Sequence, residues 1–107
     1  MVKKPVIQVI SRFADAVMKR GISIEKMVLY GSYAHGKERS DSDIDIAVVS
    51  KDFGKDRTEE GMLLFQIAGE VDVRLEPVPI SLVSYEKNTW VPLIYEIRTN
   101  GLELEAA

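Results

Sequence analysis

Two aspartates alternate with apolar residues in the stretch 43–48, which reads Asp-Ile-Asp-Ile-Ala-Val. This alternation predicts a β-strand with one apolar face, because successive side chains of a strand point to opposite sides of a sheet. Asp43 and Asp45 would then lie close together on the other face. Acidic residues are uncommon in strands, and two neighbouring carboxylates repel each other unless a cation lies between them. The chain is therefore expected to fold so that this strand has a core on one face and, on the other, carboxylates that either face solvent or bind a cation.

Periodicity elsewhere predicts an alternation of helices and strands. Apolar residues recur at three- and four-residue spacing in 5–20, as in an amphipathic helix, and the short apolar run 27–30 is typical of a buried strand. The other patterns predict a helix at 59–68, a strand at 71–76 closed by Pro77 and Pro79, a helix at 91–99 and a short edge strand at 102–104. Helices packed on a small mixed sheet, an α/β (α+β) fold, are expected from this order.

Composition narrows the classes of function. The 107 residues show no repeat or long linker, so we expect a single domain, residues 1–107. The absence of cysteine excludes thiol nucleophiles, disulfides and cysteine-ligated metals, and it fits a reducing cytoplasm. A net charge of −3 argues against binding of long nucleic acid. We find neither a signal peptide nor an apolar run near the ~20 residues of a membrane span, so a cytoplasmic protein without a membrane contact is expected.

The paired aspartates suit a hard divalent cation. Mg²⁺ prefers one or two carboxylates together with water and substrate phosphates, and Mn²⁺ suits the same oxygens. Two ions about 3.5–4 Å apart could hold the attacking and leaving oxygens of a phosphoryl transfer. Gly31 and Ser32 follow the first predicted strand, where a glycine lets the backbone approach a phosphate. Asp72 would add a third carboxylate from another strand, and Glu76 lies on the same face of that strand.

The spacing of these residues resembles a known signature. Gly31-Ser32, ten residues and then Asp43-x-Asp45 is similar to the G-S-x10-D-x-D pattern of the minimal nucleotidyltransferases of the DNA polymerase-beta superfamily. The stretch 71–75, Val-Asp-Val-Arg-Leu, resembles the strand that carries the third catalytic acid of this superfamily, which favours Asp72 over Glu76.

The resemblance implies a polymerase beta-like fold and a metal-dependent nucleotidyltransferase. Asp43 and Asp45 would bind two Mg²⁺ ions, and Asp72 would join them at the catalytic metal. Gly31 and Ser32 would hold the β- and γ-phosphates of ATP or another nucleoside triphosphate. An acceptor hydroxyl would attack the α-phosphate and release pyrophosphate.

The resemblance also implies a partner. Stand-alone members of this family typically pair with a small helical HEPN-domain protein in a toxin–antitoxin system, and in some systems they add AMP to it. Two other functions stay open at this point. The chain could neutralise its partner by contact alone, or it could transfer a nucleotide to a small hydroxylated molecule such as an aminoglycoside, where a homodimer could build a composite site.

Neighbouring residues have simpler interpretations. A calcium loop beginning at Asp41 is excluded, because Ile46 stands where such a loop requires glycine and Asp52 where it requires glutamate. Arg74, between Asp72 and Glu76, is expected to be a structural partner of the acids. His35, in the loop after Gly31-Ser32, receives no catalytic role.

Overall fold

The computed structural model describes residues 3–39 and 41–104. Its elements follow in chain order as α1 (Lys4–Lys19), β1 (Lys26–Tyr30), the 3-10 turn η1 (Gly31–Tyr33), β2 (Ile44–Ser50), α2 (Arg57–Val71), β3 (Leu75–Ser81), α3 (Leu82–Lys87), α4 (Pro92–Asn100) and β4 (Leu102–Leu104). The predicted α/β class and the helices and strands expected near 5–20, 27–30, 43–48 and 102–104 are confirmed. No helix in the described residues combines the length and the apolar character of a membrane span.

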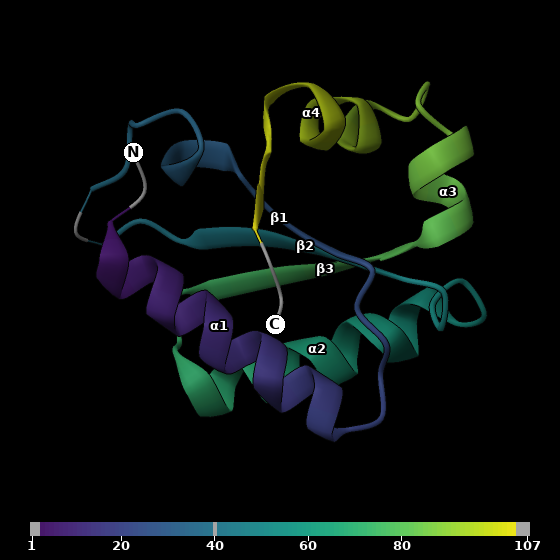
Figure 1. Ribbon diagram of the computed structural model, residues 1–107, viewed down its shortest axis with the longest axis horizontal. Coiled ribbons are helices and arrows are strands. Elements are labelled where there is room, and N and C mark those ends of the chain that lie inside the picture. Colours follow the sequence, from purple (N-terminus) through teal and green to yellow (C-terminus); the bar gives the residue numbers. More distant parts are fainter. Residues whose placement is uncertain (1–2, 40, 105–107) are drawn as a thin grey trace.

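The four strands form one mixed sheet in the order β3-β2-β1-β4 (Figure 1). β1 is antiparallel to β2 and to β4, whereas β2 and β3 are parallel and α2 connects them. Parallel strands begin at the same edge of a sheet, and an antiparallel neighbour ends there. The starts of β2 and β3 and the end of β1 therefore meet at one edge of the sheet.

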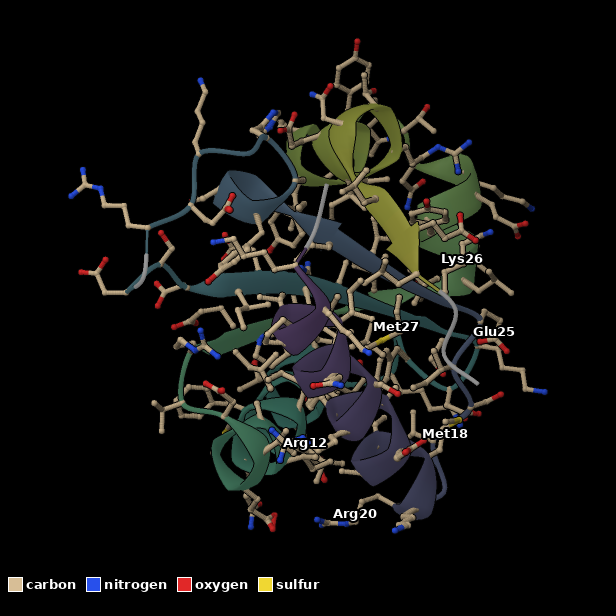
Figure 2. All side chains as sticks on the ribbon, turned by 60° about the vertical axis from the view of Figure 1, so that its left-hand side comes forward. Arg12, Met18, Arg20, Glu25, Lys26 and Met27 are labelled. Atoms are coloured by element: carbon tan, nitrogen blue, oxygen red, sulfur yellow. The ribbon has the colours of Figure 1, made fainter. Side chains whose placement is uncertain are left out.

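Helices cover both faces of the sheet. α1 and α2 pack on one face, where they bury Met27, Ile44 and Ile46, and α3 and α4 pack on the other against Val28 and Ala47. Figure 2 shows Met27 between α1 and the sheet. The alternation along β2 explains this double burial, because its even-numbered residues face α1 and α2 and its odd-numbered ones face the opposite side.

The predicted third strand is wrong in its position. α2 continues to Val71, Asp72 follows it as the C-cap, and β3 runs from Leu75 to Ser81, so it contains both prolines that were expected to close it. β3 tolerates Pro77 and Pro79 because it is an edge strand with a neighbour on one side only.

Helix α3 carries no periodic signal that the sequence analysis detected. It is short and is capped by Ser81, whose hydroxyl accepts a hydrogen bond from the Ser84 backbone N–H at 3.1 Å. α2 begins two residues earlier than predicted, because the Asp56 carboxylate caps it by accepting from the Glu59 N–H at 3.1 Å.

Candidate active site

Asp45 lies at the centre of the edge where the three strands meet. The strand register pairs Asp45 with Tyr30 of β1 on one side and with Glu76 of β3 on the other. Asp43 precedes β2 by one residue, and its position is two residues from Asp45. Asp45 is half-buried, whereas Asp43 and Glu76 are exposed. Asp43, just before β2, and Glu76 of β3 are thus the carboxylates whose charges act on Asp45.

Gly31 lies directly against the central carboxylate. Its φ of +73° is in the left-handed region, which favours glycine. A Cβ atom at this position would overlap the Asp45 carboxylate and would lie 3.1 Å from its Cγ atom. The sequence motif therefore has a physical basis, since a glycine is required for the turn to approach the acid.

The turn after β1 folds back on itself. The Gly31 carbonyl accepts hydrogen bonds from the Ala34 and His35 N–H groups at 3.1 and 3.2 Å, and the Ser32 carbonyl accepts from the Lys37 N–H at 2.9 Å. Ser32 is half-buried and directly follows Gly31, which lies against Asp45. A compact turn that brings a glycine next to a carboxylate is a suitable place for the phosphates of a metal–nucleotide complex.

His35 connects this turn to α4. Its Nε2 atom lies 3.2 Å from Oε1 of Glu96, and both side chains are partly exposed. The pKa of Glu96 is lowered, first by a hydrogen bond from Asn100 and then by His35. The contact gives His35 a partner on α4, and the sequence analysis assigns no catalytic role to this residue.

The site has an excess of negative charge. Burial raises the pKa of Asp45, and the neighbouring carboxylates of Asp43 and Glu76 raise it further. The same surroundings raise the pKa of Tyr30 to about 12, with burial as the largest cause, followed by Asp45 and Glu76. Burial disfavours any charge at this place, whereas the neighbouring carboxylates disfavour a further negative charge and would attract a cation.

The donor set fits a divalent metal ion. Within the described residues, no salt bridge or side-chain hydrogen bond engages Asp43, Asp45 or Glu76. No three acidic or histidine side chains in this part of the chain are already arranged to enclose a metal ion. Mg²⁺ does not require such a cage, because it completes its shell with water and substrate phosphates. One or two of the carboxylates of Asp43, Asp45 and Glu76 could therefore hold it together with a nucleotide.

Asp72 is hydrogen-bonded to Arg74. Its Oδ1 atom accepts hydrogen bonds from the backbone N–H and the Nε atom of Arg74 at 2.9 and 3.1 Å, and Oδ2 accepts from the NH2 group at 2.9 Å. The Arg74 side-chain hydrogen bond holds the pKa of Asp72 below its usual value. The expected place of Asp72 on the third strand is wrong, because α2 extends to Val71 and leaves Asp72 outside β3. Its expected role beside Asp43 and Asp45 stays a prediction.

Glu76 takes the place that was expected for Asp72. Both residues have the same parity in the sequence, so alternation alone could not separate them. The signal that identifies Glu76 is the pairing of Asp45 with Glu76 in the parallel register.

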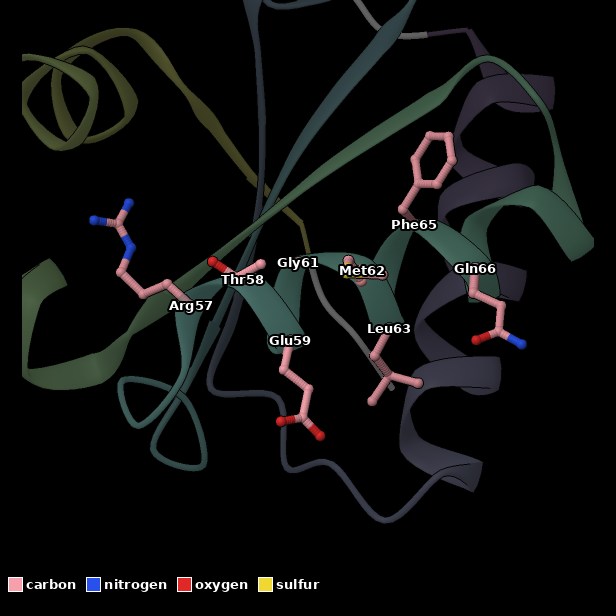
Figure 3. A pocket seen from close by; sticks show the side chains of 8 residues that line it. All are labelled: Arg57, Thr58, Glu59, Gly61, Met62, Leu63, Phe65 and Gln66. Carbon is pink, nitrogen blue, oxygen red and sulfur yellow. The ribbon is translucent and has the colours of Figure 1, made fainter.

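A separate hollow lies along α2. Arg57, Met62 and Phe65 are among the residues that line it, and Figure 3 shows that Phe65 and Leu63 point in different directions from the helix. Met62 and Phe65 are 69% and 64% exposed. None of the three carboxylates of the β2–β3 edge lines this apolar hollow, so it is distinct from the candidate active site.

Known proteins resemble this chain in sequence and in structure. The family model described as "Polymerase beta, Nucleotidyltransferase" matches residues 14–105. A protein of Methanocaldococcus jannaschii, named as an inferred protein adenylyltransferase, is 26% identical over 81 residues, which are 76% of this chain and 79% of that protein.

Two solved structures share the fold. One is an inferred nucleotidyltransferase from Sulfolobus solfataricus, with a TM-score of 0.63 and 14% identity over 91% of this chain and 77% of that one. The other is described as a toxin-antitoxin with AMP-PNP, with a TM-score of 0.59 and 25% identity over 88% of this chain and 73% of that one.

Proposed function

Because this chain belongs to the Polymerase beta nucleotidyltransferase family, and is thus a nucleotidyltransferase, we propose that it transfers AMP from ATP to a hydroxyl group of a partner protein. The partner is a HEPN-domain toxin, and this chain is the antitoxin of the pair. The names of two similar proteins support the proposal, since one is an inferred protein adenylyltransferase and the other a toxin-antitoxin that contains AMP-PNP.

One structural observation carries the chemistry. Asp45 is flanked by Glu76 in the neighbouring strand and by Asp43 two residues earlier, and Gly31 lies directly against its carboxylate. This arrangement combines oxygen ligands for a divalent cation with a turn that leaves room for phosphates. Positioning and charge neutralisation of this kind account for most of the catalysis in phosphoryl transfer.

The carboxylates have two tasks in the proposed reaction, metal binding and proton acceptance. Asp43, Asp45 and Glu76 would hold Mg²⁺, or Mn²⁺ in its place, and the bound ion would neutralise charge on the phosphates. The Gly31-Ser32 turn orients the β- and γ-phosphates. The acceptor oxygen forms a bond to the α-phosphorus while the bond from this phosphorus to the β-bridging oxygen breaks, and pyrophosphate leaves. A carboxylate oxygen of Glu76 accepts the proton of the hydroxyl group.

A labelling experiment tests the reaction. The chain is incubated with Mg²⁺ and a purified HEPN-domain protein as the proposed partner, with ATP that carries the label either at the α- or at the γ-phosphate. We expect the partner to acquire the α-label alone. Asp45→Asn should abolish the transfer, whereas Asp15→Asn, on the exposed face of α1, should leave it unchanged.

The outcomes separate the competing functions. Transfer that persists in Asp45→Asn would reject the proposed site, and transfer of the γ-label would indicate a kinase. If Asp45→Asn still neutralises the toxicity of the partner in full, inhibition by contact alone is sufficient. Labelling of an aminoglycoside in place of the protein would assign a small-molecule acceptor.

A further inference from the structure

Asp72 and Arg74 form a closed pair beside the candidate active site. The carboxylate of Asp72 accepts three hydrogen bonds from Arg74, one from its backbone and two from its guanidinium group, at 2.9–3.1 Å. A bidentate interaction of this kind fixes the orientation of the guanidinium group as well as its distance from the carboxylate. The sequence motif that includes Asp72 therefore has a structural partner that the proposed chemistry does not use.

The backbone of this pair joins the strands that carry the acids. The Arg74 carbonyl accepts a hydrogen bond from the Ile44 N–H at 2.7 Å, and the Asp72 carbonyl accepts from the Leu75 N–H at 3.1 Å. Ile44 stands between Asp43 and Asp45, and Leu75 is its register partner in β3. The pair thus lies where the register between β2 and β3 begins.

The guanidinium group also approaches the turn that contains Gly31. Hydrogen bonding to Asp72 raises the pKa of Arg74, and the Tyr33 side chain of η1 contributes in the same direction. Tyr33 is the buried last residue of that turn. Arg12, labelled on α1 in Figure 2, is a further positive charge near Asp72. Arg74 therefore lies among β2, β3 and η1.

We propose that Asp72 and Arg74 act as a clasp, a pair of positioning residues that holds the start of β2 against β3 and sets Asp45 opposite Glu76. The clasp rests on the proposed function, since its purpose is the geometry of the metal-binding acids. A one-residue slip between β2 and β3 would move every side chain to the other face, so Glu76 would leave the site. The clasp opposes this slip by fixing the hydrogen bond from the Ile44 N–H to the Arg74 carbonyl, where the pairing of β2 with β3 begins.

A double-mutant cycle tests the clasp. Asp72→Ala and Arg74→Ala should each lower kcat for AMP transfer by about tenfold to a hundredfold, as expected for a small displacement of catalytic groups. The double variant should be no worse than either single variant, because both remove the same interaction. KM for ATP should stay within about threefold of the wild-type value, since the Gly31 turn still holds the phosphates.

A conservative variant separates positioning from metal binding. In Asp72→Asn, the amide oxygen can still accept from the Arg74 backbone, so kcat should fall less than in Asp72→Ala. A direct metal ligand would behave differently, and Asp72→Asn would then be as inactive as Asp45→Asn. That result, or additive losses in the double variant, would overturn the clasp.

Amide hydrogen exchange makes the test independent of activity. Exchange at Ile44, whose N–H is bonded to Arg74, should become faster in Asp72→Ala while far-UV circular dichroism shows an intact fold. The matched control is Lys26→Ala, which breaks the 3.0 Å ion pair with Glu103 at the other end of β1 and should leave Ile44 unchanged. Unchanged exchange in Asp72→Ala would refute the clasp. If the wild-type protein transfers no label while Ile44 responds as expected, the proposed function fails and the clasp stands as a feature of the fold.

Discussion

Replacing Gly31 by alanine should disrupt the site by direct contact. Gly31 has a φ of +73°, and a Cβ atom there would overlap the Asp45 carboxylate. Gly21, at the end of α1, is a matched control, because it has a φ of +83° and no atom within 4 Å of the added carbon. Both substitutions introduce the same backbone strain, so the difference between them isolates the contact with Asp45.

The magnitude follows from two contributions. An alanine in the left-handed region costs about 1–2 kcal/mol, which applies at both positions. Forcing Asp45 away from its preferred side-chain conformation adds roughly 0.5–1.5 kcal/mol at Gly31 only. For a domain of this size, each 1 kcal/mol lowers Tm by about 4–8 °C. The Tm of Gly31→Ala should therefore lie about 2–12 °C below the Tm of Gly21→Ala, which is roughly 0.5–1.5 kcal/mol multiplied by that range.

Urea unfolding followed by circular dichroism measures the free energy, and transfer of labelled AMP measures the activity. We expect Gly31→Ala to lose at least about a hundredfold in AMP transfer, because the displaced carboxylate occupies the phosphate site. Gly21→Ala should keep wild-type activity. Equal losses of stability and equal activities in the two variants would refute the close approach of Gly31 to Asp45.

Two further predictions follow from the charges of the site. The pKa of Asp45 is raised in the folded protein by burial, Asp43 and Glu76, so ionisation of Asp45 destabilises the fold as pH rises. At pH 7 without divalent cation, Asp45→Asn should therefore stabilise the protein by roughly 0.5 kcal/mol after solvent screening, which raises Tm by about 2–4 °C. A lower Tm in this variant would contradict the reasoning. The pKa of Asp72 is lowered by Arg74, so the stability that it contributes is present above its ordinary pKa of 3.8 and is lost as pH falls through the folded value. When the pH is lowered from about 5 to about 2, the Tm of Asp72→Asn should therefore fall less than the Tm of the wild-type protein. Equal decreases of Tm in the two proteins would show that Asp72 and Arg74 do not form an ionised pair.

Local patterns in the sequence predicted much of the architecture. The spacing of apolar residues located α1, and the alternation at 43–48 identified β2 and its two faces, although β2 begins at Ile44 and leaves Asp43 just before it. Pro77 and Pro79 misled the prediction of β3, because whether a proline is tolerated in a strand depends on whether that strand lies at the sheet edge. An edge position is a property of the whole sheet and leaves no local pattern.

The sequence by itself predicted that Asp43 and Asp45 lie near each other and that a glycine-serine pair follows β1, because both features depend on neighbours in the chain. Only the tertiary structure decided which acid completes the group. Asp72 and Glu76 have the same parity, and the choice between them depends on how far α2 extends and on the register of β3 against β2. Long-range backbone hydrogen bonds set that register, and they exist only once strands distant in the chain have paired.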